Sequence, residues 1–156
     1  MSEQKEQEIF ALMEREDETQ IAQELRGQFI DKMVYSFQQG NNTIVGLSWV
    51  GVKEVARRMG GITILDVQIQ ETPEHFTVVC KARDEARKLE MSGVSRQMKI
   101  AKWGEDQFAL QKAMSKAQRN AIRSLIPETL IATCIDEFRK KGSEKVVNPF
   151  KSEAKP

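Results

Sequence analysis

The chain contains few of the side chains from which catalytic and metal sites are usually built. Its 156 residues include one histidine, two cysteines and one tyrosine. A structural zinc site needs roughly four Cys or His ligands at short spacings, whereas Cys80 and Cys134 are far apart and each lies among apolar residues. The sequence therefore predicts no metal site and no cofactor. The two cysteines are most simply reduced core thiols of an intracellular protein.

Long hydrophobic runs are also missing. No stretch of about 18 apolar residues occurs, so we expect no contact with a membrane. The first ten residues, MSEQKEQEIF, are polar and acidic, unlike a secretory signal peptide. With 40% hydrophobic and 30% charged residues, the composition is typical of a soluble globular domain.

The motifs of nucleotide hydrolysis are incomplete. The segment GLSWVGVKE (46–54) has two glycines separated by four residues, as in a phosphate-binding loop. However, Val52 occupies the position of the lysine that such a loop needs to hold phosphate. We therefore expect no ATP site, and the segment is better suited to the start of a helix.

Residues suited to hydrolytic chemistry are scattered. Four acidic residues fall on expected strands or hairpin loops, as a metal nuclease would need: Asp66, Glu71, Asp84 and Glu90. None is followed by a lysine at the spacing of such sites, and His75 belongs to no nucleophile and base set. We predict that the chain is not an enzyme. A structure-specific nuclease, or its accessory, stays open as an alternative.

Charge is distributed unevenly along the chain. Residues 1–24 carry eight acidic and two basic residues. Since the whole chain has 24 Lys and Arg and 23 Asp and Glu, the remainder carries 22 basic and 15 acidic residues. A basic body with an acidic arm indicates an anionic partner for the body. Ordinary variation of surface charge is the alternative explanation.

Local patterns predict one short helix and three strands. Ser48 is a suitable N-cap for a helix over 49–59, which Gly60 and Gly61 end. Apolar and polar residues then alternate in three runs, 62–70, 75–82 and 89–98. The polar segment RDEARK joins the last two runs as a hairpin loop. One apolar and one polar face per strand implies an antiparallel sheet covered on one side.

Two further helices complete the expected core. The first covers 104–126, with acidic residues as its N-cap, and the second begins at Pro127. The chain is therefore expected to form an α+β fold. Its β-β-β-α core is an antiparallel sheet of three to four strands crossed by a long helix.

We divide the chain into three parts. An acidic N-terminal arm, helical or disordered, covers 1–26. The core domain covers 27–139, and a disordered C-terminal tail covers 140–156.

Four cations recur every three or four residues in KAMSKAQRNAIR (112–123). At about 100° per residue they fall within roughly 60° of one another: Lys112, Lys116, Arg119 and Arg123. No acidic residue lies between Gln107 and Pro127, so nothing on the same face offsets their repulsion. A phosphate backbone would offset it. A basic helix face without a partner is the alternative.

Other residues extend this basic stretch. Arg96, Lys99 and Lys102 lead into the same helix, and Asn120 can donate to a phosphate or sugar. Trp103, at the start of the helix, is the one aromatic candidate for stacking on a base, although a Trp at such a position more often packs internally.

Two segments carry a resemblance to a known family. The run IVGLSWVGVKEVARRMGG (44–61), the three strands, and then FALQKAMSKAQRNAIRSLIPETLIATCI (108–135) resemble the annealing core of the Rad-fifty-two family. Members of this family are ring-forming proteins that anneal single strands in homologous recombination. The resemblance covers about residues 27–138. The long C-terminal recombinase-binding region of eukaryotic members has no counterpart in this sequence, which is similar to the compact annealing cores of phages, viruses and archaea.

The resemblance implies a function and a set of site residues. Rings of this family bind single-stranded DNA by its backbone in an outer groove, with the bases turned outward for pairing. By position, Arg119 and Arg123 match two groove cations, Lys32 matches a third, and Lys99 or Lys102 a further one. Asn120 stands where a basic residue is usual in the family.

We therefore expect DNA binding and ATP-independent single-strand annealing in DNA recombination and repair. The expected partners are single-stranded DNA, further copies of the chain in a homo-oligomeric ring, and a single-strand-binding protein or recombinase. The expected location is the cytoplasm of a prokaryotic, archaeal or virus-infected cell, at the nucleoid. An adaptor whose basic helix docks on an acidic protein is the remaining alternative.

Overall fold

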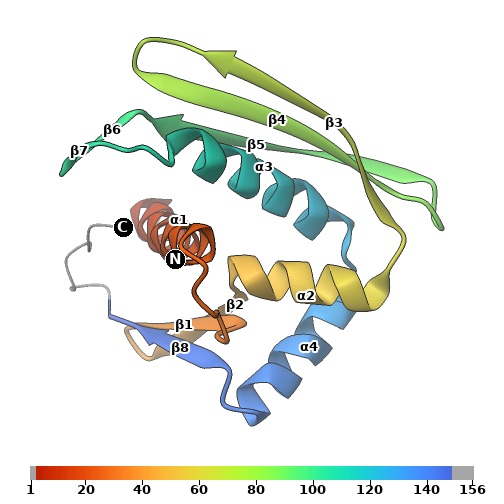
Figure 1. Ribbon diagram of the computed structural model, residues 1–156. Helices are drawn as coiled ribbons and strands as arrows, with labels where there is room; N and C mark the ends of the chain where they lie inside the picture. Colours follow the sequence, from red (N-terminus) through yellow and green to blue (C-terminus); the bar gives the residue numbers. More distant parts are fainter. Residues whose placement is uncertain (1–2, 149–156) are drawn as a thin grey trace. The chain divides into compact units, whose positions relative to one another are not determined.

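The computed structural model describes residues 3–148 and shows a mixed α+β fold (Figure 1). The described elements are α1 (Glu3–Leu25), β1 (Val34–Gln39), β2 (Asn42–Leu47), α2 (Trp49–Met59), β3 (Ile62–Glu71), β4 (His75–Asp84), β5 (Leu89–Met98), β6 (Ile100–Ala101), β7 (Gly104–Glu105), α3 (Ala109–Leu125), α4 (Glu128–Lys140) and β8 (Glu144–Val147). The chain forms two compact units, and the second consists of Val52–Ile131. The first combines the residues up to Gly51 with those from Ala132 onward.

The second unit contains the predicted β-β-β-α core. Strands β3, β4 and β5 form an antiparallel sheet in that order, and α3 lies along one of its faces (Figure 1). Alternate residues of β4, namely Val78, Cys80 and Ala82, are buried under α3, as the alternation of the sequence predicted. The expectation of an antiparallel sheet covered on one side is confirmed.

Small residues let α3 approach the sheet closely. Ala113, Ala117 and Ala121 face the sheet, and Gly93 of β5 lies directly beneath the last two. A Cβ atom on Gly93 would lie 2.3 Å from the Ala121 nitrogen and 2.4 Å from the Ala117 oxygen. The helix backbone thus rests against the strand, at a distance that no other residue than glycine permits.

A buried carboxylate closes the β4–β5 hairpin. Asp84 accepts hydrogen bonds from the backbone N–H groups of Ala86 and Arg87 and pairs with the Arg87 guanidinium at 2.9 Å. Burial acts to raise the pKa of Asp84, but the hydrogen bonds and charge of Arg87 outweigh it and hold the pKa below its usual range. Asp84 is therefore a turn-forming residue.

The start of the long helix differs from the prediction. α3 begins at Ala109 rather than at residue 104, because the preceding residues form the short β6–β7 hairpin. Gly104 has a φ of +118°, a conformation that favours glycine and interrupts a helix. Asp106 accepts from the backbone N–H of Phe108, so an acidic residue does stabilise the turn that enters α3.

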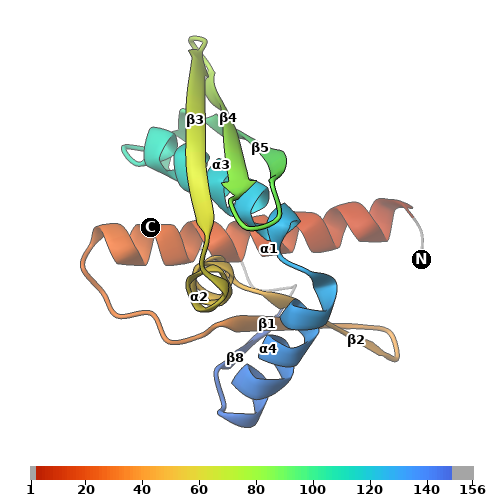
Figure 2. The ribbon, with the colours of Figure 1, turned by 90° about the vertical axis from the view of Figure 1, so that its right-hand side faces the viewer.

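The first unit contains a second, smaller sheet. Strands β2, β1 and β8 lie side by side in that order, and β8 is parallel to β1 (Figure 2). The sequence predicted a disordered tail here, which is wrong for Glu144–Val147. Pairing between residues that are about a hundred positions apart leaves no local signal. Residues 149–156 of that tail lie outside the described part of the chain.

The acidic arm is a helix whose polar side chains bind the backbone of the first unit. Asp17 accepts from the hydroxyl of Tyr35 at 2.9 Å and from the backbone N–H of Trp49 at 2.7 Å. The Gln20 amide bonds to both the Lys32 carbonyl and the N–H of Val50. Asp17 and Gln20 therefore satisfy N–H groups in the first turn of α2 that have no partner within that helix.

The predicted short helix is confirmed. α2 covers Trp49–Met59, and the hydroxyl of Ser48 accepts from the N–H of Gly51 at 3.0 Å, as expected of an N-cap. Of the helices in residues 3–148, none combines the length and the hydropathy that crossing a bilayer requires.

The contact at Gly93 leads to a prediction about stability. Gly93→Ala should lower the free energy of unfolding by about 1–3 kcal/mol, because the new methyl group must push α3 away from β5. Thermal unfolding followed by circular dichroism would measure the loss. Ser92→Ala, at the exposed neighbouring position of the same strand, should have little effect. Equal stability of the two variants would contradict the close approach.

Candidate nucleic-acid interface

The cations of α3 do not form one exposed stripe. Lys112 and Lys116 are only 1% and 4% exposed, whereas Arg119 and Arg123 are half-buried and reach solvent. The prediction of a continuous solvent-facing stripe is therefore wrong for the N-terminal half of the helix. By helical spacing, Arg119 and Arg123 lie on the side of α3 away from the alanines that face the sheet.

Lys112 has an internal counterion. Its ammonium group lies 2.7 Å from a carboxylate oxygen of Asp106 and 5.6 Å from the centre of the Trp103 ring. Both partners precede α3 in the sequence, so the expectation that no acidic residue offsets the basic stripe is wrong here. A lysine already paired in this way is poorly placed to bind a phosphate.

Arg123 also has an acidic partner, but in a more accessible setting. Its guanidinium donates two hydrogen bonds to Glu128, at 2.9 and 3.3 Å. Hydrogen bonds from Arg123 and its charge lower the pKa of Glu128, whose side chain is 79% exposed. Such exposed pairs contribute at most about 1 kcal/mol, so a phosphate group could replace Glu128.

Asn120 ties the helix to the sheet. Its side-chain amide donates to the carbonyl of Val94 in the edge strand β5 at 3.0 Å, and its amide oxygen lies 3.5 Å from a guanidinium nitrogen of Arg119. Asn120 thus sits beside the two arginines. One of its two amide N–H groups is used by this bond, so Asn120 helps to position the helix against β5.

The cations that precede α3 occupy different settings. Arg96 is exposed on the sheet face opposite α3, and Lys102 is exposed at the turn of the β6–β7 hairpin. Lys99 forms an ion pair with Glu71 and lies 4.9 Å from the centre of the Phe76 ring. Lys32 belongs to the first unit, where its ammonium donates to the Gly142 carbonyl at 3.3 Å.

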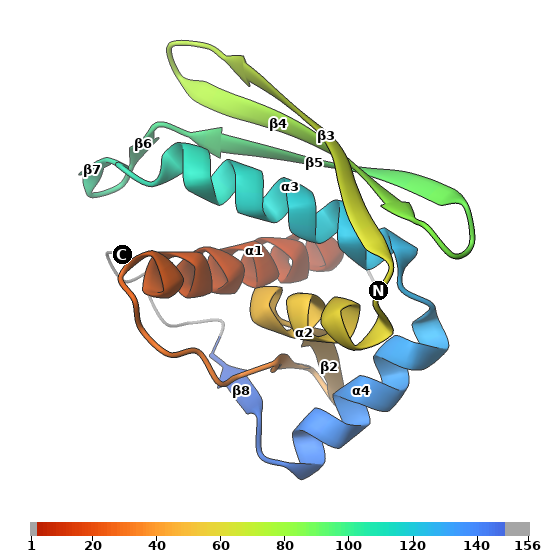
Figure 3. The same cartoon turned by 45° about the vertical axis from the view of Figure 1, so that its right-hand side comes forward.

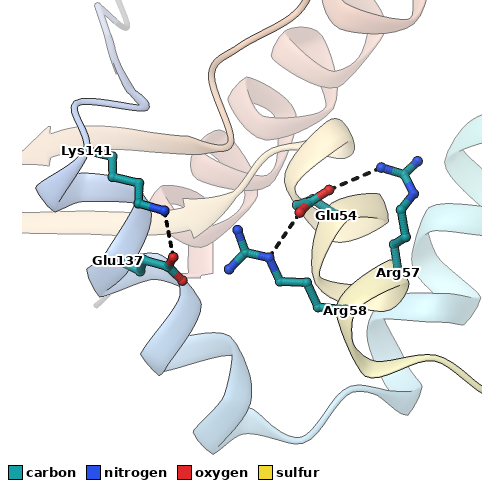
Figure 4. Close-up of polar contacts among 5 residues, drawn as sticks. All are labelled: Glu54, Arg57, Arg58, Glu137 and Lys141. Carbon is teal, nitrogen blue, oxygen red and sulfur yellow. Dashed lines mark hydrogen bonds and ion pairs between the residues drawn. The ribbon is translucent and has the colours of Figure 1, made fainter.

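The charges of α2 differ from those of α3. Glu54 accepts from Arg57 at 3.1 Å and from Arg58 at 3.0 Å (Figure 4). Glu137 of α4 pairs at 2.8 Å with Lys141, the residue that follows the helix (Figure 4). These helices carry their own counterions along one exposed face, which is typical of helix surfaces without a charged ligand.

The residues considered for hydrolysis serve the sheet. Glu90 pairs with Arg83 at 2.7 Å, and the His75 ring nitrogen bonds to the hydroxyl of Thr72. Burial, followed by the charge of Asp66, raises the pKa of the Cys80 thiol, which keeps it neutral. Across residues 3–148, no three His, Cys, Asp or Glu residues come together as potential metal ligands.

Comparisons with known proteins identify no family. No protein-family model matches the chain, and no solved structure matches it. The chain is similar to a protein of Methanocaldococcus jannaschii described as uncharacterized protein MJ0352, with 29% identity over 101 residues. The match covers 65% of this chain but 42% of the relative. Function therefore has to be argued from the residues of this chain.

The sequence did not reveal that Asp106 and Glu128 pair with cations of the basic helix. Asp106 and Glu128 lie just outside the segment between Gln107 and Pro127, which contains no acidic residue. Their spacings to Lys112 and Arg123, six and five residues, are not those of neighbours on one helix. The acidic residues close to each end of the helix were the available signal in the sequence.

The Lys112–Asp106 pair leads to a second prediction. Asp106→Asn should lower the free energy of unfolding by about 3 kcal/mol or more, because it leaves a buried ammonium without a counterion. The asparagine oxygen can still accept from Phe108, so this bond is conserved. Denaturant unfolding would measure the difference.

The double variant Asp106→Asn with Lys112→Met provides the control. It removes both charges and should recover most of the stability lost in the single variant. If the single variant were no less stable than the double variant, Lys112 would not depend on Asp106.

Proposed function

We propose that this chain binds single-stranded DNA and anneals complementary strands without ATP in recombination or repair. The observation that carries the proposal is the pair Arg119 and Arg123. Both project from the face of α3 opposite its sheet contact, in the β-β-β-α arrangement that resembles the Rad-fifty-two annealing core. Arg96 and Lys102 add exposed positive charge in the same unit.

The chemistry of these residues suits a phosphate backbone. Arginine presents several N–H donors in a planar arrangement that matches phosphate oxygens, and it stays charged at any physiological pH. Backbone contacts position a strand without reading its sequence, as annealing of any complementary pair requires. Few cations per copy would give weak, strongly salt-dependent binding.

An oligomer would compensate for weak binding by one copy. Several copies along one strand raise the overall affinity without new contacts. β3 and β5 are the outer strands of the described three-stranded sheet, and outer strands offer backbone groups for pairing with another copy. We therefore propose a homo-oligomeric ring as the working form, with a single-strand-binding protein or a recombinase as a further partner.

A strand-annealing time course tests the function directly. Two complementary labelled oligonucleotides would be mixed with and without the protein, with no nucleotide or metal ion added. We expect the protein to accelerate duplex formation over the spontaneous rate. Binding without acceleration would reduce the function to single-strand binding. No binding, even at low salt where charge attraction is strongest, would favour an adaptor for an acidic protein.

The arginines can be tested through their acidic neighbour. Arg119→Ala and Arg123→Ala should weaken oligonucleotide binding and reduce the slope of log affinity against log salt by about one unit each. Glu128→Gln should strengthen binding by about two- to fivefold, because it releases Arg123 from an exposed ion pair. Fluorescence anisotropy over a salt series would measure each effect.

Two further variants separate this site from general charge effects. Arg57→Ala removes an exposed arginine that also pairs with a glutamate, and it should leave binding nearly unchanged. In the double variant Arg123→Ala with Glu128→Gln, the gain from Glu128→Gln should disappear. A gain that persists would show that net charge, rather than Arg123, determines the affinity.

A further inference from the structure

The β6–β7 hairpin carries an unusual combination of exposed apolar and charged side chains. Ile100, in β6, is 62% exposed, and Met98, at the end of β5, is 54% exposed. Lys102 and the half-exposed Trp103 form the two-residue turn between β6 and β7. The hairpin extends from the N-terminal end of α3 (Figure 3).

The tryptophan ring is held in place from one side. The Lys112 ammonium lies 5.6 Å from the ring centre, and that ammonium is itself fixed by Asp106 at 2.7 Å. The hairpin is also tied at its base, where the Asp106 N–H donates to the Lys99 carbonyl at 2.9 Å. A ring that is already positioned loses little side-chain entropy when a ligand stacks on it.

We propose that Trp103, together with Ile100 of the same hairpin, is a stacking site for the bases of single-stranded nucleic acid. Single-strand-binding surfaces combine cations for the backbone with aromatic rings for the bases, since every base has a flat apolar face. The hairpin supplies the ring and Ile100, while the exposed Lys102 in its turn supplies charge. This inference rests on the proposed function and adds a contact to bases that the phosphate-binding arginines cannot make.

Two observations favour a base over a protein segment as the occupant. Residues 96–105 carry three cations, Arg96, Lys99 and Lys102, against one acid, Glu105. Because Lys99 is paired with Glu71, the excess positive charge that complements a polyanion comes from Arg96 and Lys102. An indole ring also has a flat face and a polar N–H edge, which suits a base more than an aliphatic side chain.

Tryptophan fluorescence provides the test. The chain has two tryptophans, and Trp49 is buried, so a ligand-induced change can be assigned by comparison with Trp103→Phe. The full-length protein would be titrated with a single-stranded oligonucleotide and with an abasic oligonucleotide of the same length. We expect quenching by the first and little by the second, because the abasic strand has the phosphates without the bases. In Trp103→Phe the quenching should disappear.

Affinity measurements provide an independent readout. Trp103→Leu should weaken binding of the base-containing strand by about fivefold to a hundredfold. It should leave binding of the abasic strand nearly unchanged. Ile100→Ala should have a smaller effect of the same kind. Leu89→Ala, an equally conservative change at the other end of β5, should have none.

The outcomes distinguish this inference from the proposed function. If both strands bind equally well and Trp103 fluorescence does not respond, the stacking site is overturned while phosphate binding stands. If neither strand binds, the proposed function fails and the stacking site with it. A change in Trp103 fluorescence with protein concentration alone would identify a second copy as the occupant and would also overturn the proposal. Thermal unfolding of each variant would exclude loss of the fold as the cause.

Discussion

The close approach of α3 to β5 is the constraint on which the arrangement of the second unit depends. Gly93 has no side chain, and Ala117 and Ala121 have the smallest ones, so helix and strand backbones meet almost directly. This contact fixes the rotation of α3 about its own axis. The rotation in turn decides that Arg119 and Arg123 project away from the sheet, and Asn120 secures it by bonding to Val94.

The position of each cation along α3 decides what it can do. Near the N-terminal end of the helix, the residues that precede it fold into the β6–β7 hairpin and bring Asp106 and Trp103 to Lys112. Near the C-terminal end, Arg123 pairs with Glu128, whose side chain is exposed, so a phosphate can take its place at low cost. A buried ion pair is costly to break, whereas an exposed one costs little. The nucleic-acid interface that we propose is therefore centred on the C-terminal half of α3.

The first unit shows how polar residues of one helix can stabilise another. The first N–H groups of a helix have no partners within it. Ser48 binds one of these groups in α2 from within the same segment, and Asp17 and Gln20 of α1 bind two more. Some of the acidic residues among the first 25 therefore stabilise the fold of the first unit. Asp17 is buried, and Glu16 pairs with Lys145 at 2.6 Å.

The sequence by itself determined the local elements. Helix 49–59 and the three strands of the main sheet were predicted to within two residues, because alternation, helical spacing and capping residues act over a few positions. Only the tertiary structure decided the rest. The pairing of β8 with β1, the start of α3 at Ala109 and the counterions of Lys112 and Arg123 depend on residues brought together by folding. Helical spacing gives the direction in which a side chain points, but its burial and its partners depend on what packs around it.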